Sequence, residues 1–172
     1  MTGASEVKIC CIQTAAEAEM ALGAGAAALG FVSHMPSGPG ILDDAIIAEL
    51  VATIPATISS FLLTSRTDIA AIEAHVRGTG VNAVQLCAPL AVEVLEPLRR
   101  RRSGIRMVQV VHVTGPESVD RARAVAPHVD SLLLDSGAPS GTALGGAAEL
   151  GGTGRTHDWR LSRRIRDEAG RP

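Results

Sequence analysis

Strand-like and helix-like patterns alternate along this 172-residue chain, and the alternation restricts the fold more than any other feature. Six short apolar runs predict strands, and each is followed by a segment whose apolar residues recur at helical spacing. The predicted strands are 6–12, 27–32, 57–63, 81–86, 105–113 and 131–134. Strand and helix units in series are typical of a parallel sheet with helical crossovers, so we expect an α/β fold.

Polar residues mark where the predicted helices begin. Thr14 and Glu17 have the Thr-x-x-Glu spacing of a capping box, and Thr114 and Glu117 repeat it. The remaining predicted N-caps are Asp43 or Asp44, Ser65 or Thr67, and Asp158. The starts at Thr14, at Ser65 or Thr67, and at Thr114 follow the preceding strand within a few residues, whereas those at Asp43 or Asp44 and at Asp158 follow longer loops.

Two architectures fit six strand–helix units. An open, doubly wound sheet accepts six strands directly, whereas a closed (β/α) barrel needs eight strands and typically about 250 residues. The first strand-to-helix turn, Cys10-Cys11-Ile12-Gln13-Thr14, lacks the G-x-G-x-x-G pattern of dinucleotide-binding sheets. Periodicity does not choose between the two, but the length predicts a single domain over residues 1–172.

The composition argues against several classes of function. Aromatic residues make up 2% of the chain and the formal net charge is −2, so we expect no nucleic-acid partner. The arginines at 99–102 are interpreted as a solvated helix end rather than a phosphate patch. Three cysteines make no disulfide framework and fit a reducing cytoplasm, and no run is apolar enough to cross a membrane. We expect a cytoplasmic protein that binds no membrane.

One carboxylate is placed for chemistry by its surroundings. The run 131–134 predicts a strand buried on both faces, and Asp135 follows at its carboxyl end. Ligands of α/β folds bind beyond the carboxyl ends of the strands, so a catalytic role is one interpretation of Asp135 and a turn cap is the other. The glycine-rich segment 151–154 precedes the helix capped by Asp158 and is either a linker or an anion-binding loop.

Cys10 stands near the end of the first predicted strand. The strand pattern alone favours a small buried hydrophobe at this position. Cys11 should alternate to the opposite face and have a structural role. The five histidines have no metal-ligand spacing, so we expect no metal and no organic cofactor. His112 ends a predicted strand and could face the same carboxyl edge of the sheet as Asp135.

Five blocks of residues resemble, in order, the phosphoribosylanthranilate isomerase family. They are Val7-Lys8-Ile9-Cys10, Gly25-Ala26 leading to Leu29-Gly30-Phe31-Val32, Ala83-Val84-Gln85-Leu86, Leu133-Leu134-Asp135-Ser136, and GGTGRTHDW at 151–159. The family is a compact (β/α)8 barrel that carries out an Amadori rearrangement in tryptophan biosynthesis. The resemblance implies a barrel of the TIM type and a small phosphorylated aminosugar as substrate.

The resemblance also implies roles for individual residues. Converting an aminoaldose to an aminoketose needs an acid that opens the sugar ring and a base that takes the proton from C2. In the family these groups stand at the positions of Asp135 and Cys10, and the substrate-binding positions are Gln85, Gly151, Gly152, Thr153 and Gly154. Lys8 or a helix N-terminus would lower the pKa of the base, and the apolar run 132–134 would raise that of the acid.

The chain departs from the family pattern in three motifs. Ser37-Gly38-Pro39-Gly40 stands where the family has Ser-Pro-Arg, whose arginine meets the anthranilate carboxylate. Cys87 replaces the histidine of Gln-Leu-His, and Cys11 replaces the glycine of Cys-Gly. Arg66 is either a substitute for the missing arginine or a residue of the helix surface.

The resemblance ends after six units, because the family's seventh and eighth units have no counterpart before Arg171-Pro172. We therefore expect an incomplete barrel of about six βα units, with the first and sixth strands open to self-association. An isomerase is the first functional hypothesis. A non-catalytic barrel that binds a ligand or a partner is the alternative.

Overall fold

The computed structural model describes residues 6–36, 38–101, 104–137, 150–151 and 154–170. Its strands are β1 (Lys8–Ile9), β2 (Ala28–Val32), β3 (Ser59–Thr64), β4 (Ala83–Leu86), β5 (Arg106–His112) and β6 (Ser131–Asp135). Its helices are α1 (Ala15–Gly23), α2 (Asp44–Ala52), α3 (Ile69–Thr79), α4 (Val92–Arg101), α5 (Glu117–Val125), the 3-10 helix η1 (Ala126–His128) and α6 (Trp159–Ala169).

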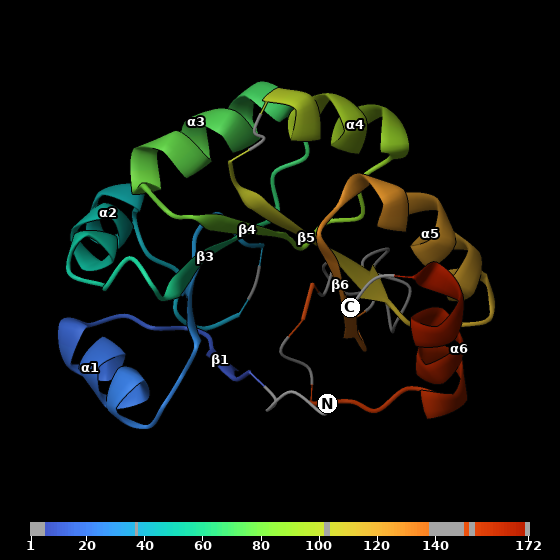
Figure 1. Cartoon of the computed structure of the whole chain (residues 1–172), viewed down its shortest axis with the longest axis horizontal. Helices are drawn as coiled ribbons and strands as arrows, with labels where there is room; N and C mark the ends of the chain where they lie inside the picture. The colour runs from blue at the N-terminus through green and yellow to red at the C-terminus, as the bar shows by residue number, and fades with distance from the viewer. Residues whose placement is uncertain (1–5, 37, 102–103, 138–149, 152–153, 171–172) are drawn as a thin grey trace.

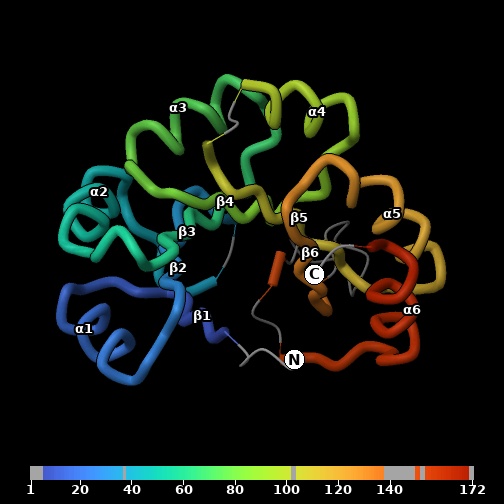
Figure 2. The backbone as a smooth tube through the Cα atoms, in the orientation of Figure 1, coloured from blue at the N-terminus to red at the C-terminus, as the bar shows by residue number. Residues whose placement is uncertain are grey.

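The six strands form one parallel sheet in the order of the sequence, β1-β2-β3-β4-β5-β6. Figure 1 shows the sheet curled, with the helices as an outer arc around it. The backbone in Figure 2 moves in one direction around that arc from the N-terminus to the C-terminus. This arrangement is the incomplete (β/α) barrel that the sequence predicts, and it excludes the doubly wound alternative because the strand order never reverses.

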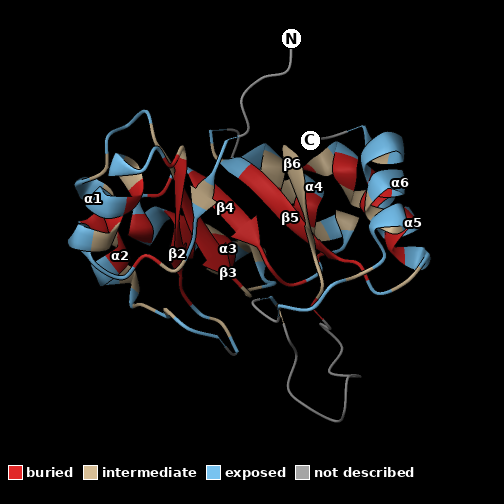
Figure 3. Cartoon of the chain, turned by 90° about the horizontal axis from the view of Figure 1, so that it is seen from below, coloured by how far each residue is buried: buried red, intermediate tan, exposed pale blue. Residues whose placement is uncertain are grey.

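The aliphatic core has two layers. Leu29, Phe31, Leu62 and Leu86 lie between the sheet and the helices, whereas the inner face of the curl buries a smaller cluster that includes Phe61. Neighbouring residues of a strand point to opposite faces, so the strands from β2 to β6 contribute to both layers. Figure 3 shows the buried strands, with exposed residues on the outer sides of the helices.

The two strands at the ends of the sheet differ from expectation. β1 is limited to Lys8–Ile9 because Cys11 adopts a positive φ of 61°, which turns the chain out of the strand. β6 is half-buried throughout rather than buried on both faces. Among the described residues β1 pairs only with β2 and β6 only with β5, which leaves the outer side of each strand less covered.

The helix starts are partly those predicted. Thr14 and Glu17 form the full capping box of α1, and Asp158 accepts a hydrogen bond from the backbone N–H of Arg160 at the start of α6. The prediction for α3 was wrong, because Asp68 is its cap and accepts from Ala71. Asp43 occupies the N-cap of α2 without a side-chain bond. The described helices include none that is long and apolar enough to cross a bilayer.

The second predicted capping box, before α5, is not formed. The Thr114 hydroxyl donates to Glu117 Oε1 at 3.1 Å instead of accepting from the backbone N–H of that residue. Pro116 is the N-cap residue, and the Ser118 hydroxyl accepts from the backbone N–H of Thr114 at 3.1 Å. This loop joins the end of β5 to α5 and so lies next to the carboxyl edge of the sheet.

Candidate active site

A cavity of about 270 Å³ lies on the inner side of the curled sheet, at the carboxyl ends of its strands. Its polar lining comes from both ends of the sheet and from the middle: Lys8, Cys10, Cys11, Gln85, Cys87 and Asp135. Parallel strands bring their carboxyl ends to one edge, so residues far apart in the sequence meet there. Cys10 and Asp135 therefore lie at the same end of the sheet and line the same cavity.

Cys10 follows directly after β1 and is exposed to solvent. Its sulfur occupies space that a side chain on β2 would otherwise fill, because a Cβ added to Gly30 would lie 3.0 Å from Cys10 Sγ. The glycine in β2 thus makes room for the thiol. Cys10 is reachable, as a base that acts on a bound substrate must be.

Cys11 also lines the cavity, contrary to the prediction of an opposite-facing structural residue. Its positive φ breaks the alternation of the strand and turns it to the same side as Cys10. Burial and the neighbouring Cys10 raise the pKa of Cys11, while the ammonium of Lys8 acts in the opposite direction. Cys11 therefore tends to stay a neutral thiol.

Lys8 and Gln85 hold each other inside the cavity. The Lys8 ammonium donates to Gln85 Oε1 and lies 4.7 Å from the centre of the Phe61 ring. The Gln85 amide nitrogen lies 3.5 Å from Cys87 Sγ, to which it donates. Burial nevertheless raises the pKa of Cys87 to about 11, so this thiol is neutral at physiological pH.

The Asp135 carboxylate ends β6 and faces His112 at the end of β5. The two residues are direct partners in the strand ladder, and Asp135 Oδ2 lies 3.5 Å from His112 Nδ1. His112 lowers the pKa of Asp135 below its ordinary value, and backbone N–H groups of Gly137 and Ser136 act in the same direction against the effect of partial burial. The expectation of a raised pKa was wrong, because the carboxylate meets hydrogen-bond donors rather than the apolar side chains of 132–134.

The glycine-rich segment reaches the same carboxylate. Gly151, with φ of 138°, lines the cavity, and a Cβ added there would lie 3.6 Å from Asp135 Oδ2. The Ser136 hydroxyl and His157 Nδ1, 2.8 Å apart, tie this segment to the end of β6. Gly154 is not among the lining residues, and Gly152 and Thr153 lie outside the described residues.

The sequence leaves the roles of Arg66 and His112 open, and the structure shows what each of them contacts. Arg66 is not among the residues that line the cavity, and its charge acts on His75 on the helix side of the sheet. The sequence predicts His112 at the end of a strand, and the structure shows its Nδ1 3.5 Å from Oδ2 of Asp135, the candidate acid. The signal that could have found it is its place at the end of β5, next to the strand that ends at Asp135.

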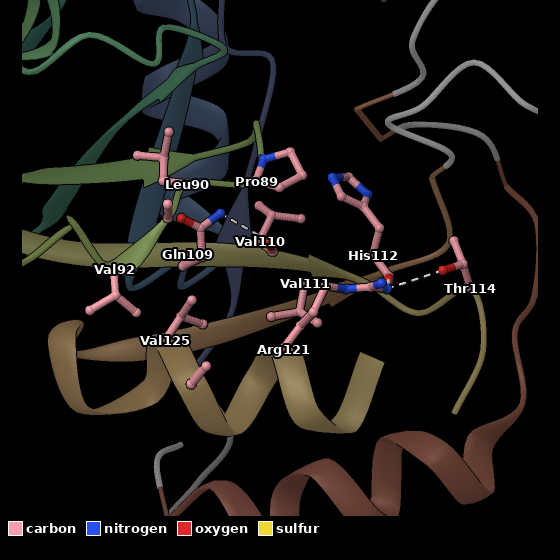
Figure 4. A pocket seen from close by; sticks show the side chains of 12 residues that line it. Pro89, Leu90, Val92, Gln109, Val110, Val111, His112, Thr114, Arg121 and Val125 are labelled. Carbon is pink, nitrogen blue, oxygen red and sulfur yellow. Dashed lines mark hydrogen bonds between the residues drawn. The ribbon is translucent and has the colours of Figure 1, made fainter. Parts of the chain in front are cut away.

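A larger cavity of about 350 Å³ lies between β5 and the helices α4 and α5. Figure 4 shows its largely aliphatic walls, with Arg121 reaching across from α5. The Arg121 guanidinium already donates to His112 O, Thr114 Oγ1 and Ser118 Oγ. Among the described residues, this cavity has no thiol or carboxylate in its lining, so the smaller cavity is the better candidate for proton transfer.

A curated relative and a solved structure that are similar to this chain carry the same name. The N-(5'-phosphoribosyl)anthranilate isomerase 2 of Methanosarcina mazei is 31% identical over 96% of this chain and 71% of its own length. The phosphoribosyl anthranilate isomerase of Thermus thermophilus has a TM-score of 0.76 over 97% of this chain and 74% of that structure, at 18% identity.

A further solved structure carries a bound ligand. It is a phosphoribosyl anthranilate isomerase in complex with reduced 1-(o-carboxyphenylamino)-1-deoxyribulose 5-phosphate, with a TM-score of 0.73 over 95% of this chain and 71% of that structure, at 22% identity. No family model matches the chain.

Proposed function

The chain belongs to the phosphoribosylanthranilate isomerase family, an isomerase family of tryptophan biosynthesis, and we propose that its inner cavity carries out the family's Amadori rearrangement. The substrate would be N-(5-phosphoribosyl)anthranilate, a phosphorylated aminosugar, and the product the carboxyphenylamino-deoxyribulose phosphate. The free thiols of Cys10, Cys11 and Cys87 fit a cytoplasmic location, where thiols stay reduced.

The observation that carries this proposal is the meeting of Cys10 and Asp135 in one cavity of about 270 Å³. The reaction needs an acid and a base on the same substrate, and these two groups come from opposite ends of the sheet. Asp135 would protonate the ring oxygen as the sugar opens. The Cys10 thiolate would then take the proton from C2, with the Lys8 ammonium as the nearby positive charge.

Substrate contacts are assigned to the remaining polar groups of the cavity. Gln85 is fixed by Lys8 and presents its amide to the interior, and Gly151 brings backbone close to Asp135. We assign the anionic part of the substrate to the backbone of Gly151, Gly152, Thr153 and Gly154, ahead of the N-terminus of α6.

The anthranilate end of the substrate has fewer charged contacts than the family pattern provides. Within the described lining of the cavity, Lys8 is the one lysine or arginine. A bidentate arginine–carboxylate contact is among the stronger hydrogen-bonded pairs in proteins. We therefore expect a higher KM than an enzyme with Ser-Pro-Arg at this loop would have.

Loss of the fluorescence of the anthranilate aminoaldose tests the proposal directly. The purified chain should accelerate the rearrangement, and the gene should allow a tryptophan auxotroph that lacks this isomerase to grow. Asp135→Asn, prepared in parallel, measures the background. Turnover no faster than that of Asp135→Asn, together with binding of the product analogue, would favour the non-catalytic alternative.

A further inference from the structure

His112 is held by its strand partner and by the neighbouring strand. It lies directly opposite Asp135 in the β5–β6 ladder, so the two side chains leave the sheet on the same face. Figure 4 shows the imidazole rising from β5 on the side away from α5. The ring is buried, with 2% of the side chain exposed. Its contacts are therefore set by protein atoms rather than by solvent.

The hydrogen bonds of the ring determine which nitrogen carries a proton. Nε2 lies 3.0 Å from the carbonyl oxygen of Cys87, and because a carbonyl only accepts, Nε2 must be the donor. In the neutral ring Nδ1 would then be a bare acceptor. It would face Asp135 Oδ2 at 3.5 Å and, among the described residues, no hydrogen-bond donor reaches it.

Two acceptors facing each other in a buried site repel, and one proton between them removes the repulsion. The position of that proton follows from the other contacts of the carboxylate. Asp135 Oδ2 accepts from the backbone N–H of Gly137 at 2.9 Å, which favours the ionised carboxyl. The proton therefore belongs on His112 Nδ1 in the unliganded protein.

The other charged and titratable groups around His112 leave this assignment intact. From α5, Arg121 contacts the backbone oxygen of His112 rather than the ring, and Glu117 lies 3.6 Å from the same guanidinium. From β4, Cys87 is a neutral thiol. Asp135 is thus the charged side chain that faces Nδ1.

We propose that His112 holds the proton that Asp135 delivers to the sugar ring, so that the acid of the reaction is the His112–Asp135 pair. The proposal rests on the isomerase function proposed above. His112 acts through Asp135 and does not touch the substrate, which makes it a positioning residue. An ionised carboxylate has no proton to donate, so Asp135 needs a proton source in order to act as the acid. His112 supplies that proton.

The proton transfers balance over one turnover. The Nδ1–H bond breaks as Asp135 gains a proton, which passes to the ring oxygen as the C1–O bond breaks and the amine nitrogen forms a double bond to C1. Cys10 takes the proton from C2 and returns it to C1. The proton of the 2-hydroxyl, released as the ketone forms, restores the pair.

Two substitutions separate proton storage from orientation. His112→Gln can keep the donor to the Cys87 carbonyl, and His112→Asn can keep a donor near the place of Nδ1, but neither side chain titrates. Both variants should lose about 100-fold in kcat at about pH 8 with KM changed less than about threefold. His128→Asn makes the same change in η1, which precedes the amino end of β6, away from the carboxyl edge of the sheet, and should leave kcat unaltered.

The ratio of wild-type to variant kcat should decrease as the pH falls, because solvent then protonates a growing fraction of Asp135 in the variant. Cys10 is present in both proteins, so its contribution cancels in the ratio. Wild-type kcat in His112→Asn at about pH 8 would reduce His112 to an orienting donor and overturn the proposal, as would a ratio independent of pH.

A second measurement is independent of isomerase activity. In protein labelled with ¹⁵N-histidine, the His112 ring should stay doubly protonated to a higher pH in the wild type than in Asp135→Asn. An inactive wild type with this difference would refute the proposed function and support the shared proton. Identical ring titrations in the two proteins would refute the shared proton, whatever the activity.

Discussion

At the scale of single residues, the proposed acid–base chemistry depends on a thiol and a carboxyl that line one cavity from the two ends of the sheet. Cys10→Ser and Asp135→Asn each remove one proton-transfer group with little change in volume. Each should lower kcat at least about 100-fold, the usual contribution of a positioned acid or base. Steady-state kinetics by anthranilate fluorescence measures the loss.

The same two variants should remain folded, because neither side chain supports the aliphatic core. Urea unfolding and circular dichroism provide that control. If either variant kept most of the wild-type turnover, the residue concerned would not be the acid or the base.

The neighbouring thiols show why the thiol assignment depends on position rather than residue type. Cys87 is buried with a pKa raised to about 11, and burial also raises the pKa of Cys11. Both therefore hold their protons near neutral pH and are poor bases. Cys10 is the exposed thiol of the three.

At the scale of elements, the packing of β2 against the end of β1 determines where Cys10 can lie. A methyl group on Gly30 would come within 3.0 Å of Cys10 Sγ and 3.1 Å of Leu63 Cδ1. Gly30→Ala should cost about 1–3 kcal/mol of unfolding free energy through overpacking. It should also lower kcat by displacing the thiol, since about 1 Å of misplacement can cost 100-fold.

Gly78→Ala is the matched control for this change. Gly78 lies in α3, is exposed, and has no atom within 4 Å of an added Cβ. The same substitution there should stabilise the protein by about 0.5–1 kcal/mol, because alanine favours helix. Equal activity and stability in Gly30→Ala and the wild type would show that the β1–β2 contact does not position Cys10.

The helices α2 and α3 are linked by a buried histidine. His75 Nε2 lies 2.8 Å from Asp44 Oδ1, and Nδ1 lies 3.1 Å from the Thr64 hydroxyl at the end of β3. Asp44 also accepts from the Ser33 hydroxyl at 2.7 Å. The network joins the ends of β2 and β3 to the helices that follow them.

This network makes stability depend on pH. Burial lowers the pKa of His75 below its ordinary value of 6.5, although Asp44 acts in the opposite direction. The unfolded chain therefore binds more protons than the native protein in this range, so stability falls as the pH drops through about 6.5 and below. Urea midpoints between about pH 7.5 and pH 5.5 measure the slope.

His75→Gln should reduce that slope even though it lowers stability at every pH. Asp135, whose pKa is lowered from 3.8, titrates below this window and does not contribute. A slope in His75→Gln as steep as that of the wild type would assign the pH dependence to other groups.

At the scale of the whole molecule, the described sheet is curled with β1 and β6 at its two ends. Val7, which precedes β1, and Ile9 in β1 are 52% and 40% exposed. Apolar residues on a strand with an unpaired side favour pairing with another chain. We expect concentration-dependent self-association, measurable by sedimentation, and expect Ile9→Lys to reduce it.

Met20→Lys is the control that distinguishes association through the β1 edge from association through any exposed apolar side chain. Met20 lies on α1, away from the strand edge, and is 73% exposed. Its substitution should leave the association constant unchanged. A monomer at all concentrations, or equal effects of the two lysines, would contradict association through β1.

The sequence by itself determined the elements, their order and the family. Six apolar runs, capping residues such as Thr14 and Asp158, and five family blocks are local patterns, and local patterns specify strands, helix starts and motifs. They also placed Cys10 and Asp135 at strand ends. Because parallel strands end at one edge, positions at strand ends put the two residues at the same edge of the sheet.

Only the tertiary structure decided what surrounds those residues. The left-handed turn at Cys11 brings its thiol into the cavity beside those of Cys10 and Cys87, and β6 is half-buried because, among the described strands, only β5 pairs with it. The β5–β6 register puts His112 beside Asp135, and His112 lowers the pKa of Asp135, where the sequence predicted a raised one. Register and burial depend on contacts between segments far apart in the chain, and a local pattern does not contain them.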